Sequence, residues 1–395
     1  MPSTISNGGG YGPLGLLDSD TTAFTKDVRS YLDKNVAPLI AEAERTKTFP
    51  VDILPGLIEL GYVRGGLPEN DGGYGMSHLQ SAVLMEEAGR CWGSLRTTLN
   101  ILSMVAELLS KHGTDDQKER FLAPLLEGRR RGWFALTEPE SGSDAGALRT
   151  RATEREDGSW VLNGQKVWIT NASYGDFGVV LATVDRSLGH KGIGAFLVET
   201  STPGLEINEI PHMPVRASSS CEVVLTEVVV PAQNLLGQVG RGLSVAMSAV
   251  NGGRLNIAAG AVGLMQAALE AAQGHVLARE QFGRPLAGFQ LVQELIVKMA
   301  VQTQAGRLLY QNAASTLDAG QPGRLECSIA KYFCSEAAVV ATSQAIQLFG
   351  GSGLMEEFPV ERLFRDARES TIPEGTSEIQ VLQIGDALLG VSALR

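Results

Sequence analysis

The feature that most constrains the fold is a change of hydrophobic periodicity that occurs twice along the chain. Residues 21–128 carry apolar side chains at helical spacing. Residues 133–239 instead show short runs rich in Val, Ile, Trp and Thr, separated by Gly, Asp, Asn and Pro, as strands do. After Arg241 the chain returns to long alanine-rich helical segments that are nearly free of proline. The sequence therefore predicts an α+β, mostly α fold with an N-terminal helical domain (residues 1–131), a middle β-barrel or sandwich (132–240) and a C-terminal helical bundle (241–395).

Local signals refine this organisation. Asn163-Gly164 lies between two alternating runs in residues 160–169, a pattern typical of a β-hairpin. Further strands are expected at 177–184, 194–198 and 221–230. C-terminal helices are expected at 244–280, 290–317 and 324–349, with a last one from Thr376.

Composition excludes several classes of protein. The 395-residue chain has a net charge of −11, which argues against a nucleic-acid partner. Its four cysteines show no CxxC pair, which is typical of thiols in a reducing compartment. The first ten residues lack the features of a signal peptide, and no apolar run is long enough to span a membrane. We therefore expect a cytoplasmic protein without a membrane partner.

One carboxylate near the C-terminus is placed for chemistry. Glu374 lies between Pro373 and Gly375, and Thr376 follows as a potential helix cap. Proline fixes its own φ, and glycine lets the backbone come close to a ligand. A carboxylate in such a turn can be aimed and desolvated, as a general base must be. An ordinary capping acid at a helix start is the alternative.

Several ordered motifs resemble those of the flavin-dependent acyl-CoA dehydrogenase family over residues 20–389. The motifs are Thr137-Glu138-Pro139-Glu140-Ser141-Gly142-Ser143-Asp144, Trp168-Ile169-Thr170-Asn171, Arg279-Glu280-Gln281-Phe282-Gly283-Arg284-Pro285-Leu286, Gln347-Leu348-Phe349-Gly350-Gly351-Ser352-Gly353, Arg365-Asp366-Ala367 and Glu374-Gly375-Thr376. The resemblance implies a C-terminal four-helix bundle, FAD, an acyl thioester on CoA or an acyl carrier protein, a homotetramer or homodimer, and an electron-transfer flavoprotein as possible partner.

The resemblance also assigns the cofactor residues. FAD is expected to contact Phe134, Leu136, Thr137, Gly142, Ser143, Trp168, Ile169 and Thr170, with Thr137 and Thr170 bonding the flavin ring and Trp168 near its face. The pyrophosphate and adenine, partly of a neighbouring subunit, are expected to contact Arg279, Phe282, Gln290, Gln347, Leu348, Gly350, Gly351, Thr376 and Glu378. Arginine suits phosphate, and Phe282 offers a flat surface to adenine.

The family's reaction removes an α-proton while a β-hydride passes to the flavin. Glu374 matches the commonest base position, and the enolate oxygen is expected to bond the Glu374 backbone N–H and a ribityl hydroxyl. Part of the family carries its base just before the arginine of the first C-terminal helix. That position is Gly253, before Arg254, and glycine cannot act as a base.

Substrate contacts are expected at Arg96, Ser143, Asn251, Arg254 and Gly375. An arginine near position 96 resembles the glutaryl-CoA dehydrogenase branch and the polyketide-pathway acyl-carrier-protein dehydrogenases, where it lies near the distal polar group. These features predict a short polar or carboxylated acyl group. The branch's histidine after Glu374 is absent, which argues against glutaryl decarboxylation.

Two other functions stay open at this point. Relatives of the same fold oxidise hydroxyacyl or aldehyde groups on carrier proteins in secondary metabolism, some of them as oxidases. A non-catalytic helical flavin-binding protein is the alternative from another class, and the intact Glu374 argues against it.

Overall fold

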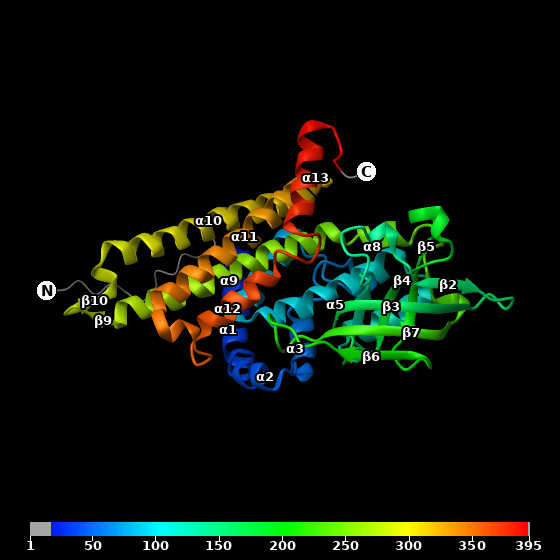
Figure 1. Cartoon of the computed structure of the whole chain (residues 1–395), viewed down its shortest axis with the longest axis horizontal. Coiled ribbons are helices and arrows are strands. Elements are labelled where there is room, and N and C mark those ends of the chain that lie inside the picture. The colour runs from blue at the N-terminus through cyan, green and yellow to red at the C-terminus, as the bar shows by residue number, and fades with distance from the viewer. Residues whose placement is uncertain (1–16, 394–395) are drawn as a thin grey trace.

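The structure is a computed structural model that describes residues 17–393. The first ten residues, on which the signal-peptide expectation rests, lie outside that part. Helices form both ends of the chain and a sheet forms the middle, so the predicted α+β, mostly α class is confirmed (Figure 1). The N-terminal helices are α1 (Ser19–Asn35), α2 (Ile40–Thr46), α3 (Leu54–Glu59), α4 (His78–Cys91), α5 (Gly93–His112), α6 (Asp115–Gln117) and α7 (Ala123–Leu126).

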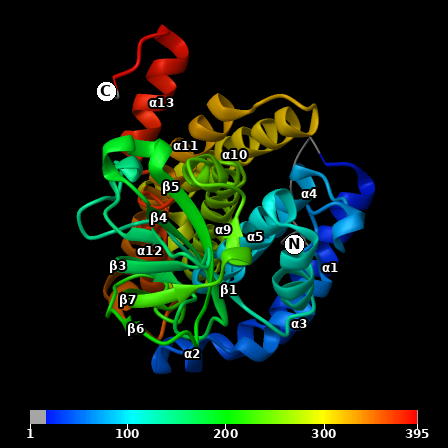
Figure 2. The ribbon, with the colours of Figure 1, turned by 90° about the vertical axis from the view of Figure 1, so that its right-hand side faces the viewer.

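The middle part is one eight-stranded sheet with the order β6-β7-β3-β2-β4-β5-β8, and β1 pairs with β4 in parallel. Figure 2 views the molecule from the side on which the sheet lies. Its strands are β1 (Gly132–Ala135), β2 (Arg151–Glu154), β3 (Trp160–Thr170), β4 (Phe177–Thr183), β5 (Ile193–Glu199), β6 (Leu205–Glu209), β7 (Ser220–Val230) and β8 (Leu235–Leu236).

The hairpin predicted at Asn163-Gly164 is wrong. Both residues lie inside the single strand β3, where the register to β7 shifts at Gly164. Gly164 has φ +154° and a Cβ there would lie 2.6 Å from the Thr150 hydroxyl. The Asn163 side chain donates to Glu227 at 2.7 Å across the pair. The Asn-Gly signal thus marks a bulge in place of a turn.

The C-terminal part consists mainly of long helices. The predicted helix 244–280 is broken in two near Ser248, and the 324–349 helix is found with the expected bounds. The elements are α8 (Gly242–Met247), α9 (Val250–Ala278), α10 (Gln290–Asp318), α11 (Arg324–Phe349), α12 (Pro359–Glu369) and α13 (Ser377–Leu389), with the short strands β9 (Glu280–Gln281) and β10 (Arg284–Pro285) between α9 and α10.

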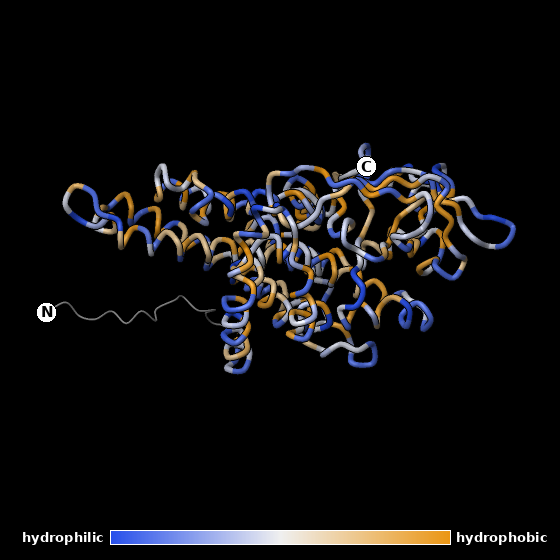
Figure 3. The backbone as a smooth tube through the Cα atoms, turned by 90° about the horizontal axis from the view of Figure 1, so that it is seen from below, coloured by the Kyte–Doolittle hydropathy of each residue, from blue (hydrophilic) through white to orange (hydrophobic). Residues whose placement is uncertain are grey.

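Helix α9 is the centre of the molecule. It packs against α4, α10, α11 and α12 (Figure 1), and apolar residues recur along these helices while hydrophilic stretches gather in outer loops (Figure 3). Gly242–Ala278 is the one stretch of the described residues that is long and apolar enough to cross a membrane, yet 78% of its most apolar window is buried inside the fold. A helix buried in the core of a folded protein can have this length and this apolar composition without crossing a membrane.

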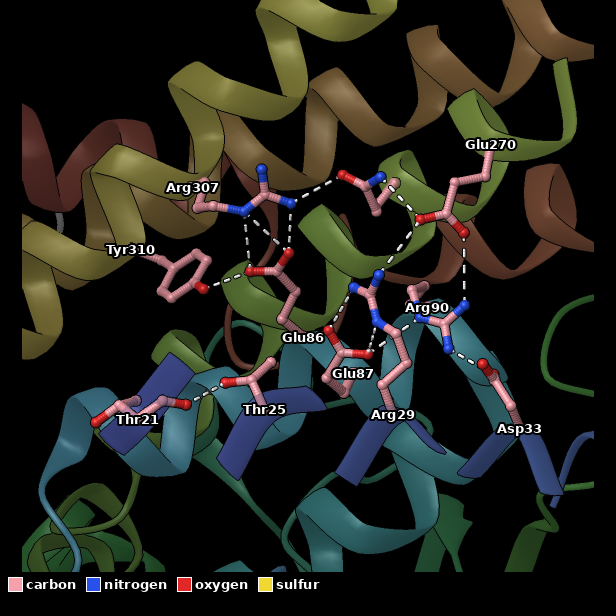
Figure 4. A network of polar contacts seen from close by, with 11 residues as sticks. Thr21, Thr25, Arg29, Asp33, Glu86, Glu87, Arg90, Glu270, Arg307 and Tyr310 are labelled. Atoms are coloured by element: carbon pink, nitrogen blue, oxygen red, sulfur yellow. Dashed lines mark hydrogen bonds and ion pairs between the residues drawn. The ribbon is translucent and has the colours of Figure 1, made fainter. Parts of the chain in front are cut away.

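A buried polar network ties α4 to its neighbours (Figure 4). Glu86 of α4 accepts from Arg307 of α10 at 2.5 Å and from the Tyr310 hydroxyl. The next residue, Glu87, accepts from Arg29 of α1 at 2.7 Å. Because breaking a buried ion pair costs about 3–5 kcal/mol, this network fixes α4, one wall of the cavity described below, against the C-terminal helices.

Candidate active site

Glu374 lies in the loop between α12 and α13, in a backbone conformation that non-glycine residues rarely adopt. Its φ is +56°, and that of Gly375 is +88°. Two side chains hold this loop by its carbonyl groups. The Lys331 ammonium donates to Gly375 O at 2.8 Å, and the Gln380 amide donates to Glu374 O at 3.1 Å. Left-handed backbone at a non-glycine residue costs on the order of 1–3 kcal/mol. These hydrogen bonds therefore stabilise a backbone conformation that would otherwise be unfavourable.

Helix α9 makes room for the Glu374 carboxyl. A Cβ atom at Gly253 would lie 2.7 Å from the carboxyl carbon, so the carboxyl occupies its present position only because this residue is glycine and would have to move if a side chain were added. The following residue, Arg254, is buried and donates to Glu374 O at 3.3 Å and to the Ser328 hydroxyl at 3.4 Å. Arg254 therefore supports the Glu374 loop by a hydrogen bond to its backbone.

The surroundings of Glu374 tune its acidity. Burial raises the pKa of its carboxyl to about 7, while Arg254, Lys331 and a hydrogen bond from Asn100 act in the opposite direction and Glu369 adds to the rise. Both charge forms are then populated near neutral pH. A general base works best when its pKa lies near the working pH.

A cavity of about 740 Å³ opens between α4, α5, α9 and the residues that follow α3. Asn251 and Gly252 of α9 line it, as does Asn256 one turn beyond Gly253. The Asn256 amide donates to Asn100 Oδ1 at 2.9 Å, and Asn100 is the residue that hydrogen-bonds Glu374. The cavity and the carboxyl are thus separated by one pair of amide side chains. The sequence analysis missed Asn100 and Asn256, because a single amide in a helix carries no motif.

The structure does not bring Arg96 to the cavity. Its side chain is wholly buried, its guanidinium pairs with Glu369, and the Ser370 hydroxyl lies 3.5 Å from it. We expected this cation to face the distal end of the substrate. In the structure its charge is compensated by a carboxylate of the same chain.

Two strand ends carry the residues expected around the flavin ring. Val167 N donates to Thr137 O at 3.1 Å, which sets the ends of these two segments side by side. Trp168 has φ +59° and is 61% exposed, whereas Ile169 is buried. Phe134, Leu136, Thr137 and Thr170 are partly buried, and Gly142 and Ser143 are exposed. An exposed indole beside hydroxyl and backbone groups fits a flat, polar-edged ring.

A buried ion pair beneath this region was missed by the sequence analysis. The Lys166 ammonium lies 2.7 Å from Glu138 and 3.0 Å from Leu136 O. Glu138 also accepts from the backbone N–H groups of Arg149 and Thr150. The pair therefore fixes both ends of the loop that presents Gly142 and Ser143.

The residues expected around the pyrophosphate and adenine lie far from Glu374. Arg279 is the C-cap residue of α9, so it follows the helix instead of lying on it. Gln290 is the first residue of α10. Both residues are exposed. Phe282 is 94% exposed in the β9–β10 turn. The 26 residues of helix from Gly253 to Arg279 span roughly 40 Å at 1.5 Å per residue. One chain does not bring this turn and Glu374 together.

The other expected cofactor residues lie at the two ends of the α11–α13 region. Gln347, Gly350 and Gly351 are exposed at the end of α11, and Leu348 is buried. Thr376 caps α13 by accepting from Ile379 N at 3.3 Å, and Glu378 is exposed in the first turn. A Cβ atom at Gly350 or Gly351 would meet nothing within 4 Å, so both positions leave open space for a ligand.

Comparison with known proteins agrees with this architecture. The N-terminal, middle and C-terminal domain models of acyl-CoA dehydrogenases match residues 18–129, 133–228 and 240–389. The short-chain specific acyl-CoA dehydrogenase of Bos taurus mitochondria is 40% identical over 91% of this chain and 88% of its own. The structure of butyryl-CoA dehydrogenase from Megasphaera elsdenii is 37% identical with a TM-score of 0.90, covering 94% of this chain and 99% of its own. A glutaryl-CoA dehydrogenase from Mycobacterium smegmatis in complex with FADH2 is 32% identical with a TM-score of 0.91, covering 98% and 100%.

The chain belongs to the acyl-CoA dehydrogenase family. It is an FAD-dependent oxidoreductase that acts on the CH–CH group of an acyl-CoA. The predicted family, cofactor and reaction class are therefore confirmed.

Proposed function

We propose that the enzyme oxidises a short acyl-CoA at its Cα–Cβ bond with Glu374 as the base. The close approach of the Glu374 carboxyl to Gly253 carries this proposal, because it sets the carboxyl against α9, and burial raises the pKa of that carboxyl to about 7. Glu374 takes the α-proton, the Cα–H and Cβ–H bonds break and a double bond forms between the two carbons. When bound, FAD supplies the acceptor for the β-hydride.

The enolate oxygen needs a donor when the α-proton leaves. Glu374 has a positive φ, and three side-chain donors occupy carbonyl groups of its loop. Its N–H group is the donor we assign to the enolate oxygen.

The cavity supports a short acyl group. Asn256 lies three residues after Gly253 on α9, a rise of about 4.5 Å. A straight acyl group that starts at Glu374 thus reaches the amide pair after a few carbon atoms. Relatives named as short-chain and butyryl-CoA dehydrogenases agree with that length.

A second copy of the chain is part of the proposal. Four apolar side chains of α10, Leu291, Val297, Val301 and Leu308, are each more than half exposed, as are Leu388 and Leu389 of α13. A neighbouring subunit would cover such a surface and would bring its own Arg279 and Phe282 toward this chain's flavin.

The test is to mix the purified, FAD-loaded protein with a panel of straight-chain acyl-CoA thioesters without oxygen. We expect the flavin absorbance to bleach fastest with chains of four to five carbons. Slow reoxidation in air would support an electron-transfer flavoprotein as acceptor, and fast reoxidation an oxidase. A flavin that no thioester bleaches would overturn the proposal.

A further inference from the structure

We propose that the Asn100–Asn256 amide pair forms the acyl-binding end of the site and selects an acyl group with an uncharged hydrogen-bonding group at its distal end. This inference rests on the proposed function and specifies its substrate class.

The pair has a fixed direction. Asn256 Nδ2 donates to Asn100 Oδ1, so the Asn100 amide nitrogen is left to donate to Glu374. Asn100 is only 4% exposed, whereas Asn256 is partly exposed and lines the cavity. Asn256 therefore presents its carbonyl oxygen, an acceptor, to whatever occupies the cavity.

Helix geometry continues this polar surface. Asn100, Ser103 and Glu107 follow each other at three- and four-residue spacing on α5, so they share one face. Ser103 and Glu107 line the cavity. The α5 wall of the cavity next to the amide pair therefore carries hydrogen-bonding side chains instead of a purely aliphatic surface.

The charges of the cavity argue for a neutral group. Among the residues that line it, Lys118 pairs with Asp71 at 2.8 Å and Lys111 pairs with Glu107. His78 lies 2.8 Å from Asp318. The described lining thus holds no arginine or lysine without an acidic partner. A substrate carboxylate would enter a site whose cations are already compensated, which disfavours it.

The cavity therefore fits a hydroxyl donor more closely than either a methyl or a carboxylate. A matched pair of thioesters separates these cases: 4-hydroxybutyryl-CoA and pentanoyl-CoA differ only by a hydroxyl in place of a methyl, and glutaryl-CoA adds the charge. The hydroxyl lies beyond the carbons that react, so Cα–Cβ oxidation is chemically the same in all three.

The experiment measures kcat/KM for the three thioesters with the FAD-loaded wild type and with Asn256→Leu, a change of similar shape that removes the acceptor. We expect the wild type to favour 4-hydroxybutyryl-CoA over pentanoyl-CoA, and the variant to lower this ratio by about tenfold or more, as loss of one buried hydrogen bond does. Gly274→Ala, on the same helix but outside the cavity, where a Cβ atom would meet nothing within 4 Å, is the control and should leave the ratio within about twofold.

Three outcomes would overturn the inference: a wild type that prefers pentanoyl-CoA, one that prefers glutaryl-CoA, or a ratio that Asn256→Leu leaves unchanged. The wild-type comparison stands even if the variant does not fold. Failure of the proposed function is seen separately, as butyryl-CoA bleaching that persists in Glu374→Gln.

Discussion

Arg96 and Glu369 form a buried ion pair that joins α5 to the last residue of α12, at the start of the loop that carries Glu374. The Arg96 stem packs against α9 at Gly260, where a Cβ atom would lie 2.7 Å from Arg96 Cγ. This arginine thus supports the loop that carries Glu374, and a substrate carboxylate would have to compete with Glu369 for it.

Arg96→Met is expected to shift the pH dependence of the reaction. The charged and polar groups facing Glu374 are Arg254 of α9, Lys331 of α11, Asn100 of α5 and Glu369 of α12, and Glu369 raises the pKa of Glu374. Without Arg96, the negative charge of Glu369 loses its ion-pair partner, so the pKa of Glu374 should rise further. Less base is then present at a given pH, and the acidic limb of kcat/KM should move to higher pH.

The double variant Arg96→Met/Glu369→Gln is the control for this shift. It removes both charges, so the acidic limb should return toward that of the wild type, and stability should recover part of the roughly 3–5 kcal/mol lost on breaking a buried pair. Identical pH profiles for the single and double variants would show that the pair has no electrostatic effect on the base.

Glu374→Gln is expected to keep FAD and lose substrate-dependent bleaching. The amide preserves the shape of the carboxyl but cannot accept the α-proton, and loss of a general base costs at least about 10²–10⁴ in rate. In the wild type, kcat/KM should rise with pH through about 7 as Glu374 loses its proton. Near-normal turnover by the variant would assign the base to another residue.

Gly253→Ala should lower activity while leaving the fold at least as stable. The new methyl group would lie within 3 Å of the Glu374 carboxyl and displace it, whereas alanine in a helix is favoured over glycine by about 1 kcal/mol. Gly274→Ala on the same helix is the control, because its Cβ would meet nothing within 4 Å. Equal kcat/KM for both variants would contradict the contact between Gly253 and the base.

The sequence predicted the fold class and the turn that carries Glu374 because both depend on local signals. Periodicity separates α5 and α11 from β4 and β7, and the Pro373–Gly375 frame marks a turn. The Asn163-Gly164 error has a physical cause: the same dipeptide suits a hairpin turn and a bulge, and only the pairing of β3 with β7 decides between them.

Long-range partners could not be predicted in the same way. Arg96 is separated from Glu369 by 273 positions, and Asn100 from Asn256 by 156. A lone arginine on an apolar helix looks the same in sequence whether it meets a substrate or an acid of its own chain. Pairings of this kind arise only when α5, α9 and α12 are packed together.

Arg279→Ala is expected to release FAD and weaken the assembly together. Within one chain Arg279 lies roughly 40 Å along α9 from Gly253, so a contact with the flavin's pyrophosphate has to come from a second copy. Loss of one charge-assisted hydrogen bond costs about 1.5–3 kcal/mol, which corresponds to a tenfold to hundredfold weaker Kd for FAD. Glu280→Ala, an exposed neighbour in the same turn, serves as control and should retain the cofactor. The two variants are compared by their flavin content after gel filtration. The elution volume of the same run gives the oligomeric state. Stoichiometric flavin in the arginine variant at high salt would show that this turn does not hold the pyrophosphate.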